Sequence, residues 1–297
     1  FHGYVLRRTG CSLDNAGKTL LNLPPYKQIV GILSLTDREN EILNQHAEDA
    51  KANVIAGNDT GKFLTQKFYM EYRLNVAFAK TDPAAPNPKF ETIEQWEKVK
   101  STKMDTCAKI CAHYLYRDDV EDVDFREGKL LTFPPNGGYH PSQGHSRKRK
   151  ILIYSEFPSV TPILRNLLAL YKIPSLSIDG TMSYDKRAQV VAEFYQLKSA
   201  RVLVFSSVGT TGLNLTIADI VIFLDQPWSA QDERQILGRA YRQPQAKTVK
   251  AIHLLAENSS DVLINGMARG KKDMLEAFVN KEQGKGECYN DLPFLFC

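Results

Sequence analysis

Two arginines and a glutamine stand at helical spacing in the segment QILGRAYRQPQ, Gln235–Gln245. Gln235, Arg239 and Arg242 follow one another at i, i+4 and i+7, so a helix through this segment would project all three from one face. The planar guanidinium fork of arginine matches phosphate oxygens, and Gly238 would let a phosphate or a neighbouring backbone come close. The segment therefore predicts a phosphate sensor, and a solvated basic helix face is the alternative.

A loop rich in glycine, serine and threonine precedes this segment and lies between two apolar runs. Val202–Phe205 and Ile220–Leu224 are unbroken apolar stretches, as expected of parallel strands buried on both faces. The small and polar residues of the loop are Ser206, Ser207, Gly209, Thr210, Thr211, Gly212 and Asn214. Hydroxyl and backbone N–H groups at the carboxyl end of a parallel strand suit a phosphodiester backbone. A loop that only turns the chain is the alternative, and the order of strand, loop, strand and arginine segment favours phosphate binding.

The same order of segments resembles the second motor lobe of the SWI/SNF-type ATP-dependent DNA translocases, a branch of the superfamily 2 helicases. GTTGLNL (209–215) is similar to their motif V, DQPW (225–228) to the strand end that follows it, and QILGRAYRQPQ to motif VI. The earlier segments that also fit are KILIYSEF (150–157) as motif IV, SIDGTMSYDKRAQVVAEF (177–194) after it, STKM (101–104) at the start of the lobe, and VLRRT (5–9) and LPP (23–25) at the close of the first lobe. Several ordered motifs are far more specific than any one alone.

The resemblance implies an α/β fold with a RecA-like parallel sheet and helices on both faces. This is the second lobe of a P-loop NTPase, preceded by a helical linker or insertion. ATP and Mg²⁺ would be held mainly by a first RecA-like lobe of the same polypeptide. Arg239 and Arg242 would act as arginine fingers on the γ-phosphate across the cleft, with Gln235 orienting the site. The positions expected to face the nucleotide are Gly209, Gly212, Asp225 and Gly238.

Double-stranded DNA is the partner that the resemblance implies, with nucleosomes as one form of it. The residues expected to hold the phosphates of the tracked strand are Ser155, Ser206, Thr211 and Asn214. Closure of the two lobes would ratchet this strand. We therefore expect the full-length protein to be a nuclear, DNA-dependent ATPase of the chromatin-remodelling or DNA-repair type that has no membrane partner.

A P-loop and an acidic pair for Mg²⁺ are needed for nucleotide hydrolysis, and neither is found in the sequence. Asn15–Leu21 contains Gly-Lys-Thr, but Ser12 stands where the first glycine of a P-loop belongs and no apolar strand leads into it. Gly57–Phe63 has one residue too few between its glycines and ends in phenylalanine. No Asp-Glu pair ends a buried strand before residue 100. We expect the chain to be the C-terminal half of a motor and to be inactive by itself.

Departures from the family pattern leave a second function open. Ser207 and Thr210 stand where motif V usually has a basic residue and a second glycine, and Tyr241 replaces the usual histidine of motif VI. A non-catalytic nucleic-acid-binding or scaffold module derived from such a lobe would tolerate these changes. Retention of Arg239 and Arg242 favours the motor. A P-loop lobe encoded immediately upstream would discriminate between the two.

Composition narrows the class of protein further. The 297 residues are 43% hydrophobic, enough for a sizeable core, and the net charge is only +4, so nucleic-acid binding must come from local placement of charge. No segment has the length and apolarity of a membrane span, and the start of the chain does not look like a signal peptide. The five cysteines are too few for a disulfide framework. We interpret Cys107 and Cys111 as core residues instead of zinc ligands, and expect no metal site.

Apolar periodicity predicts the order of elements. Residues 1–100 would hold the tail of the first lobe, extended to about residue 30, and a linker or insertion with helices at Asp37–Ala56 and Phe63–Ala79. Residues 101–258 would form the RecA-like lobe, with a loop insertion at 118–149, and residues 259–297 two closing helices, Ser259–Met267 and Asp273–Val279, and a tail. The strands expected in the lobe are Ile151–Tyr154, Ser175–Ile178, Val202–Phe205, Ile220–Leu224 and Val249–Leu255. The helices expected between them are Ser101–Arg117, Val160–Tyr171, Tyr184–Gln196 and Ser229–Tyr241, the last with Ser229 as N-cap.

Overall fold

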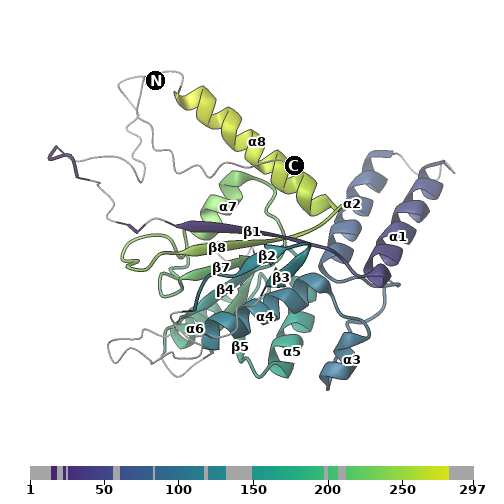
Figure 1. Ribbon diagram of the computed structural model, residues 1–297, viewed down its shortest axis with the longest axis horizontal. Coiled ribbons are helices and arrows are strands. Elements are labelled where there is room, and N and C mark those ends of the chain that lie inside the picture. Colours follow the sequence, from purple (N-terminus) through teal and green to yellow (C-terminus); the bar gives the residue numbers. More distant parts are fainter. Residues whose placement is uncertain are drawn as a thin grey trace.

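A six-stranded parallel sheet forms the centre of the molecule (Figure 1). The computed structural model describes residues 15–18, 23–24, 26–55, 61–82, 84–116, 120–131, 149–196, 200–206 and 212–280. The strands of the sheet are β1 (Lys27–Leu33), β4 (Ile151–Tyr154), β5 (Ser175–Ile178), β6 (Val202–Phe205), β7 (Ile220–Phe223) and β8 (Lys250–Ala256), in the order β1-β8-β7-β4-β6-β5. Every pairing is parallel, so the carboxyl ends of all six strands meet at one edge, the carboxyl edge.

The central strands are buried on both faces, as their unbroken apolar runs predicted. Each residue of β4, β6 and β7 is buried. Alternate side chains enter two separate cores, since Ile151 and Ile153 belong to the first core and Leu152 and Tyr154 to the second. Because helices cover both faces of these strands, neither face meets solvent, and polar residues do not alternate with apolar ones along the strand. The predicted strands between Ile151 and Leu224 are therefore confirmed, with β7 ending one residue early.

Helices cover both faces of this sheet. They are α1 (Asp37–Ile55), α2 (Gly61–Ala77), α3 (Ile93–Glu97), α4 (Thr102–Tyr116), α5 (Thr161–Leu170), α6 (Tyr184–Tyr195), α7 (Ala230–Leu237) and α8 (Ser260–Asn280), with a 3-10 turn η1 at Pro158–Val160. Ile110 of α4 and Leu164 of α5 pack in the first core, whereas Phe194 of α6 and Ile236 of α7 pack in the second. The helices α1 and α2 lie side by side at one end of the sheet (Figure 1). The α/β class with a parallel sheet covered on both faces is confirmed.

The strand β1 lies partly in the stretch that the sequence analysis assigned to an extended linker. It pairs in parallel with β8 and forms an edge of the sheet. Only part of β1 is buried, so its sequence KQIVGIL lacks the apolar run of a central strand. A hairpin of β2 (Asp124–Arg126) and β3 (Lys129–Leu131), from the 118–149 insertion, packs on it. The ring of Phe125 fills the space that a Cβ at Gly31 would need.

The last described helix, α8, is continuous, so the prediction of two closing helices is wrong. It runs from Ser260 to Asn280 through Gly266, through Met267, at which the first of the two helices was expected to end, and through Gly270. Ile264 and Ala268 are buried on its inner face, and this packing outweighs the low helix propensity of the two glycines.

Cys107 and Cys111 are buried in the first core, which confirms their interpretation as core residues. A hydrogen bond with Cys107, together with burial, raises the pKa of the Cys111 thiol. Among the described residues, no group of three or more His, Cys, Asp or Glu side chains is placed to hold a metal ion. Within the same part of the chain, no helix has both the length and the apolarity needed to cross a membrane.

Candidate functional site

The arginine segment is a helix end followed by turns. The helix α7 covers Ala230–Leu237 and is capped at its C-terminus by Gly238. Arg239 and Arg242 therefore lie beyond the helix, and the prediction that they share one helix face with Gln235 is wrong. Helical spacing persists in the sequence past the residue at which the chain leaves the helix.

Gln245 explains why the chain turns here. Its side chain is buried, and its Nε2 lies 3.0 Å from the carbonyl oxygen of Thr216, 2.8 Å from that of Ala218 and 3.2 Å from that of Ala240. The two amide hydrogens can serve two of these acceptors at a time. A longer α7 would carry Gln245 away from the loop before β7, so these bonds hold the turns in place. Sequence reasoning assigned no role to Gln245, although it closes the motif VI-like segment.

Arg239 is the predicted arginine finger with an unsatisfied donor. Its Nε is buried and has no hydrogen-bond partner among the described residues, while its carbonyl oxygen accepts from the N–H of Leu215 at 2.9 Å. A buried donor without an acceptor is costly unless a ligand supplies one. Arg242 and Gln235 are exposed. At Gly238, a Cβ would meet only carbonyls of α7 itself among the described residues, so no neighbouring segment uses the space.

The loop after β6 is described only at its two ends. Ser206 is buried and its hydroxyl has no partner in the described part of the chain. Gly212 has a φ of +81°, a left-handed conformation that explains glycine at this position. Asn214 is exposed, and its side-chain oxygen accepts a backbone N–H of the following turn. Gly209 and Thr211 lie outside the described residues.

Asp225 and Ser155 face the interior. The Ser155 hydroxyl donates to Asp225 Oδ2 at 2.8 Å, and the backbone N–H of Glu156 donates to the same oxygen at 3.1 Å. Lys103 Nζ lies 3.7 Å from Asp225 Oδ1. Burial raises the pKa of Asp225, and the charge of Lys103 opposes that rise. Neither Asp225, as a predicted nucleotide contact, nor Ser155, as a predicted DNA contact, can touch a ligand without opening the fold.

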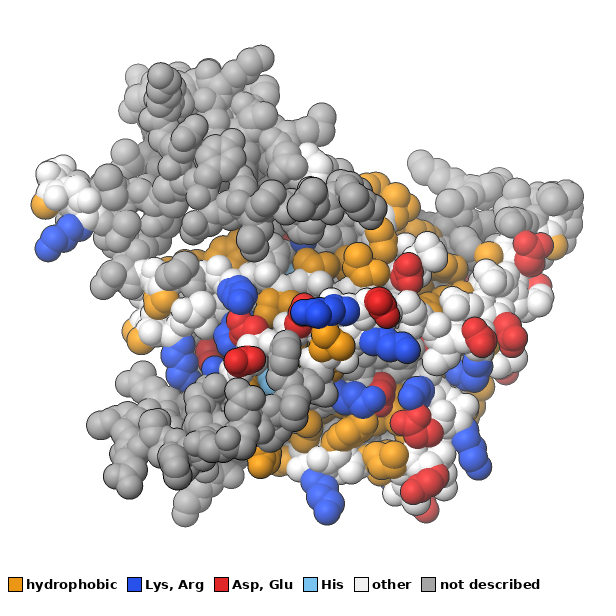
Figure 2. Space-filling view, in the orientation of Figure 1, with side chains coloured by type: hydrophobic (Ala, Val, Ile, Leu, Met, Phe, Trp, Pro, Cys, Tyr) orange, Lys and Arg blue, Asp and Glu red, His pale blue; other side chains and the backbone are white. Residues whose placement is uncertain are grey.

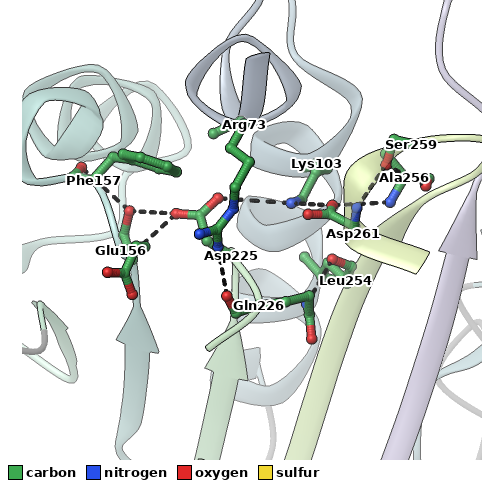
Figure 3. A network of polar contacts seen from close by, with 12 residues as sticks. Arg73, Lys103, Glu156, Phe157, Asp225, Gln226, Leu254, Ala256, Ser259 and Asp261 are labelled. Atoms are coloured by element: carbon green, nitrogen blue, oxygen red, sulfur yellow. Dashed lines mark hydrogen bonds and ion pairs between the residues drawn. The ribbon is translucent and has the colours of Figure 1, made fainter. Parts of the chain in front are cut away.

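Asp225 belongs to a buried charge network at the carboxyl edge, made of Arg73, Lys103, Asp225 and Asp261 (Figure 3). Lys103 of α4 donates to Asp261 of α8 at 2.6 Å. Arg73 of α2 donates to the carbonyl oxygen of Gln226 at 2.6 Å and lies beside Asp225. Two cations balance two carboxylates, and the network joins three helices to the end of β7. Lys103 and Gln226 lie in the segments STKM and DQPW, where no local pattern predicted that these two side chains would be buried in a polar network.

The start of α7 is as the sequence predicted. Ser229 has extended backbone geometry, and its hydroxyl oxygen accepts the N–H of Asp232 at 3.1 Å. Asp232 and Glu233 place negative charge in the first turn, at the positive end of the helix. Ile236 and Leu237 bury the inner face of α7 in the second core. The start and the direction of the arginine segment are thereby set.

The described elements that flank the two P-loop-like segments show where each segment lies in the chain. The segment 57–63 follows α1, which ends at Ile55, and overlaps the start of α2 at Gly61, so it joins two helices. Gly17 lies in a turn ahead of β1, and Thr19 lies outside the described residues. In the part of the chain that the structure describes, neither segment follows a strand of the sheet.

Surface charge is mixed on the face shown in Figure 2. Acidic and basic side chains alternate over its coloured part instead of separating into a field of one sign. This agrees with a net charge of +4 and means that recognition of a polyanion depends on the local geometry of individual residues.

Sequence relatives of the chain are helicases. Residues 141–244 match the family model described as the helicase conserved C-terminal domain. The ATP-dependent helicase ULS1 of Saccharomyces cerevisiae is 33% identical over 158 residues, which cover 51% of this chain and 10% of that protein. The chromatin-remodeling ATPase INO80 of Homo sapiens is 31% identical over 140 residues, covering 47% of this chain and 9% of that protein. The matched part of the chain thus spans about a tenth of the length of these relatives.

Solved structures share the fold. The C-terminal part of the Fun30 ATPase domain aligns with a TM-score of 0.58 and 18% identity, covering 88% of this chain and 98% of that one. The SWI2/SNF2 ATPase core of Sulfolobus solfataricus in complex with dsDNA aligns with a TM-score of 0.57 and 17% identity, covering 86% of this chain and 46% of that one. The sheet and its helices therefore have the fold of a SWI2/SNF2 C-terminal, RecA-like lobe.

Proposed function

We propose that this chain, whose relatives are ATP-dependent helicases and whose fold is that of SWI2/SNF2 C-terminal lobes, is the second motor lobe of an ATP-dependent translocase of double-stranded DNA. In this proposal ATP and Mg²⁺ are held mainly by a first RecA-like lobe of the same polypeptide. The similarity to human INO80, a chromatin-remodeling ATPase, supports a nuclear role on nucleosomal DNA. The dsDNA complex of the structurally similar ATPase core of Sulfolobus solfataricus supports the choice of DNA as partner.

The joint between the loop after β6 and the arginine turns is the observation that carries the proposal. Leu215 N–H bonds to the Arg239 carbonyl at 2.9 Å, and Gln245 holds the same two segments together from the other side. The described end of the expected DNA-facing loop and the backbone of the expected phosphate-facing arginine are therefore joined in one unit. Such a unit would couple the position of the DNA strand to the state of the nucleotide.

Each side chain then has a separate task. The buried Nε of Arg239 donates a hydrogen bond to a γ-phosphate oxygen, and the guanidinium stabilises the charge that develops there. The exposed Arg242 adds a second guanidinium. Gln235, on the outer side of α7, orients the site. Asn214 offers an exposed amide to the phosphates of the strand. The Ser206 hydroxyl has no partner among the described residues but is buried, so it would reach a phosphate only if the loop after β6 opens.

The test measures DNA-stimulated ATP turnover of the full-length protein. Arg239→Ala and Arg242→Ala should each lower turnover on the order of 10³-fold, as arginine-finger losses do. Lysine at either position should rescue little, because it lacks the planar fork. Gln231→Ala, exposed on the helix α7 that precedes the two arginines, is the control and should leave turnover unchanged. The chain 1–297 by itself should not hydrolyse ATP.

Four outcomes would contradict parts of the proposal. Full turnover in both alanine variants would exclude the arginine-finger role, and lost turnover with a collapsed thermal midpoint would make the arginines structural. A full-length protein that binds DNA but never hydrolyses ATP would be the non-catalytic scaffold, to which the departures at Ser207 and Thr210 point. Turnover by the isolated chain would place the nucleotide site here and not on a first lobe.

A further inference from the structure

Glu233 links α7 to the sheet beneath it. Its Oε1 accepts from Gln28 Nε2 of β1 at 3.3 Å and lies 3.4 Å from His253 Nε2 of β8. The His253 side chain is fully buried, whereas 23% of the Glu233 side chain is exposed. The rest of the inner face of α7 is apolar, with Ile236 and Leu237 in the second core. Glu233 is therefore the polar contact that can set the direction of α7 on the sheet, where apolar contacts alone tolerate sliding.

His253 is held in one orientation. Its Nδ1 lies 3.0 Å from Gln226 Oε1, and because a carbonyl oxygen only accepts, Nδ1 carries the hydrogen. The Nε2 of the ring lies 3.1 Å from the amide nitrogen of Gln28 and 3.4 Å from Glu233 Oε1. The ring also stacks on Phe223, with centroids 4.4 Å apart and planes 2° from parallel. The amide of Gln28 thus bridges a fixed imidazole and the Glu233 carboxylate.

Gln226 extends this chain of contacts to the carboxyl edge. Its Oε1 also accepts from Asn265 of α8 at 3.3 Å, and its Nε2 donates to the carbonyl of Leu254 at 3.1 Å. Its own carbonyl accepts from Arg73. A continuous polar path therefore runs from the buried charge network through Gln226, His253 and Gln28 to Glu233.

We infer that Glu233 and His253 are positioning residues that set the place of Arg239, an inference that rests on the proposed function. Gly238 N–H bonds to a carbonyl of α7 at 2.9 Å and Arg239 N–H to another at 3.1 Å, so the turn that carries Arg239 follows α7 rigidly. A shift of α7 would move the guanidinium with it. A misplacement of about 1 Å at a reacting group costs on the order of 10²-fold in rate.

The first experiment separates kcat from KM in the full-length protein. Glu233→Ala should lower kcat for DNA-stimulated ATP hydrolysis by about 10- to 100-fold, while KM for ATP changes little because the first lobe holds the nucleotide. Glu233→Gln should restore most of kcat, since its amide oxygen still accepts from Gln28. Gln28→Ala, on the edge strand, removes the same bridge without touching α7 and should reproduce the loss. Gln231→Ala is again the control.

The second experiment is a double-mutant cycle with Arg239→Ala. If Glu233 acts through Arg239, the double variant should lose no more turnover than Arg239→Ala alone. Losses that multiply would overturn the inference, as would full kcat in both Glu233→Ala and Gln28→Ala. Arg239→Ala separates the two levels of the argument. Full turnover in that variant means that the proposed function has failed, whereas its inactivity beside a normal Glu233→Ala means that only the positioning role has failed.

Discussion

Removing the charge of Lys103 should destabilise the lobe more than any change at its surface. Lys103 is fully buried, with its Nζ 2.6 Å from Asp261 and 3.7 Å from Asp225. In Lys103→Met, Arg73 is left as the only cation of the network to balance two buried carboxylates. Leaving an uncompensated charge by breaking a buried pair costs about 3 to 5 kcal/mol. A domain of this size loses about 2 to 4 °C of thermal midpoint per kcal/mol, so the midpoint should fall by about 6 to 20 °C.

Urea unfolding of the chain, followed by circular dichroism, measures this free energy. Lys109→Met is the matched control, because Lys109 is on the same helix with 46% of its side chain exposed and pairs with Asp105 at 2.8 Å. The exposed ammonium of Lys109 is screened by water, and the buried carboxylate of Asp105 keeps hydrogen bonds from Trp96 and Tyr171, so loss of this pair should cost about 0.2 to 1 kcal/mol. The double variant Lys103→Met/Asp225→Asn restores charge balance in the network and should recover part of the loss.

The pH dependence gives a second check on the same variant. Burial already raises the pKa of Asp225, and loss of Lys103 removes a charge that opposes the rise. A carboxyl whose folded pKa lies above its unfolded value is tolerated best when protonated, so the deficit of Lys103→Met should grow as the pH rises from acid to neutral. A deficit below 1 kcal/mol, or one equal to that of Lys109→Met, would refute the reasoning.

Two further predictions concern other contacts. Burial acts to raise the pKa of Asp122, but hydrogen bonds from Lys250 and Lys27 outweigh burial, so the pKa is lowered. The ionised Asp122 carboxylate therefore stabilises the fold above its unfolded pKa of about 3.9, and this stabilisation is lost as the pH falls through the lower folded pKa. Asp122→Asn should therefore show a flatter unfolding free energy below about pH 4 in acid titrations, and an unchanged slope would contradict this. Gln245→Ala should cost about 1 to 3 kcal/mol and speed amide exchange at Leu215, because the loop loses its carbonyl contacts. Equal exchange in this variant and in Gln231→Ala would exclude that anchoring role.

Local chemistry is sufficient to predict much of this lobe. Runs such as Ile151–Tyr154 and Val202–Phe205 consist of apolar residues on both faces of the strand. Such strands bury all their side chains only in a sheet that helices cover on both faces. The cap at Ser229 depends on residues three positions apart, which any reading of the sequence can compare.

Only the tertiary structure decided which polar residues are buried and where each segment stops. The sequence by itself determined the alternation of strands and helices and the motifs they carry, because those depend on near neighbours. The edge strand β1 depends on β8, near the other end of the described chain, and the end of α7 depends on bonds from Gln245 to carbonyls before β7. Arg73, Lys103, Asp225 and Asp261 come from four separate segments, and each by itself reads as a solvated charge. These charges can be buried because the two cations and the two carboxylates neutralise one another in the folded protein. No local stretch of sequence contains this long-range electrostatic condition.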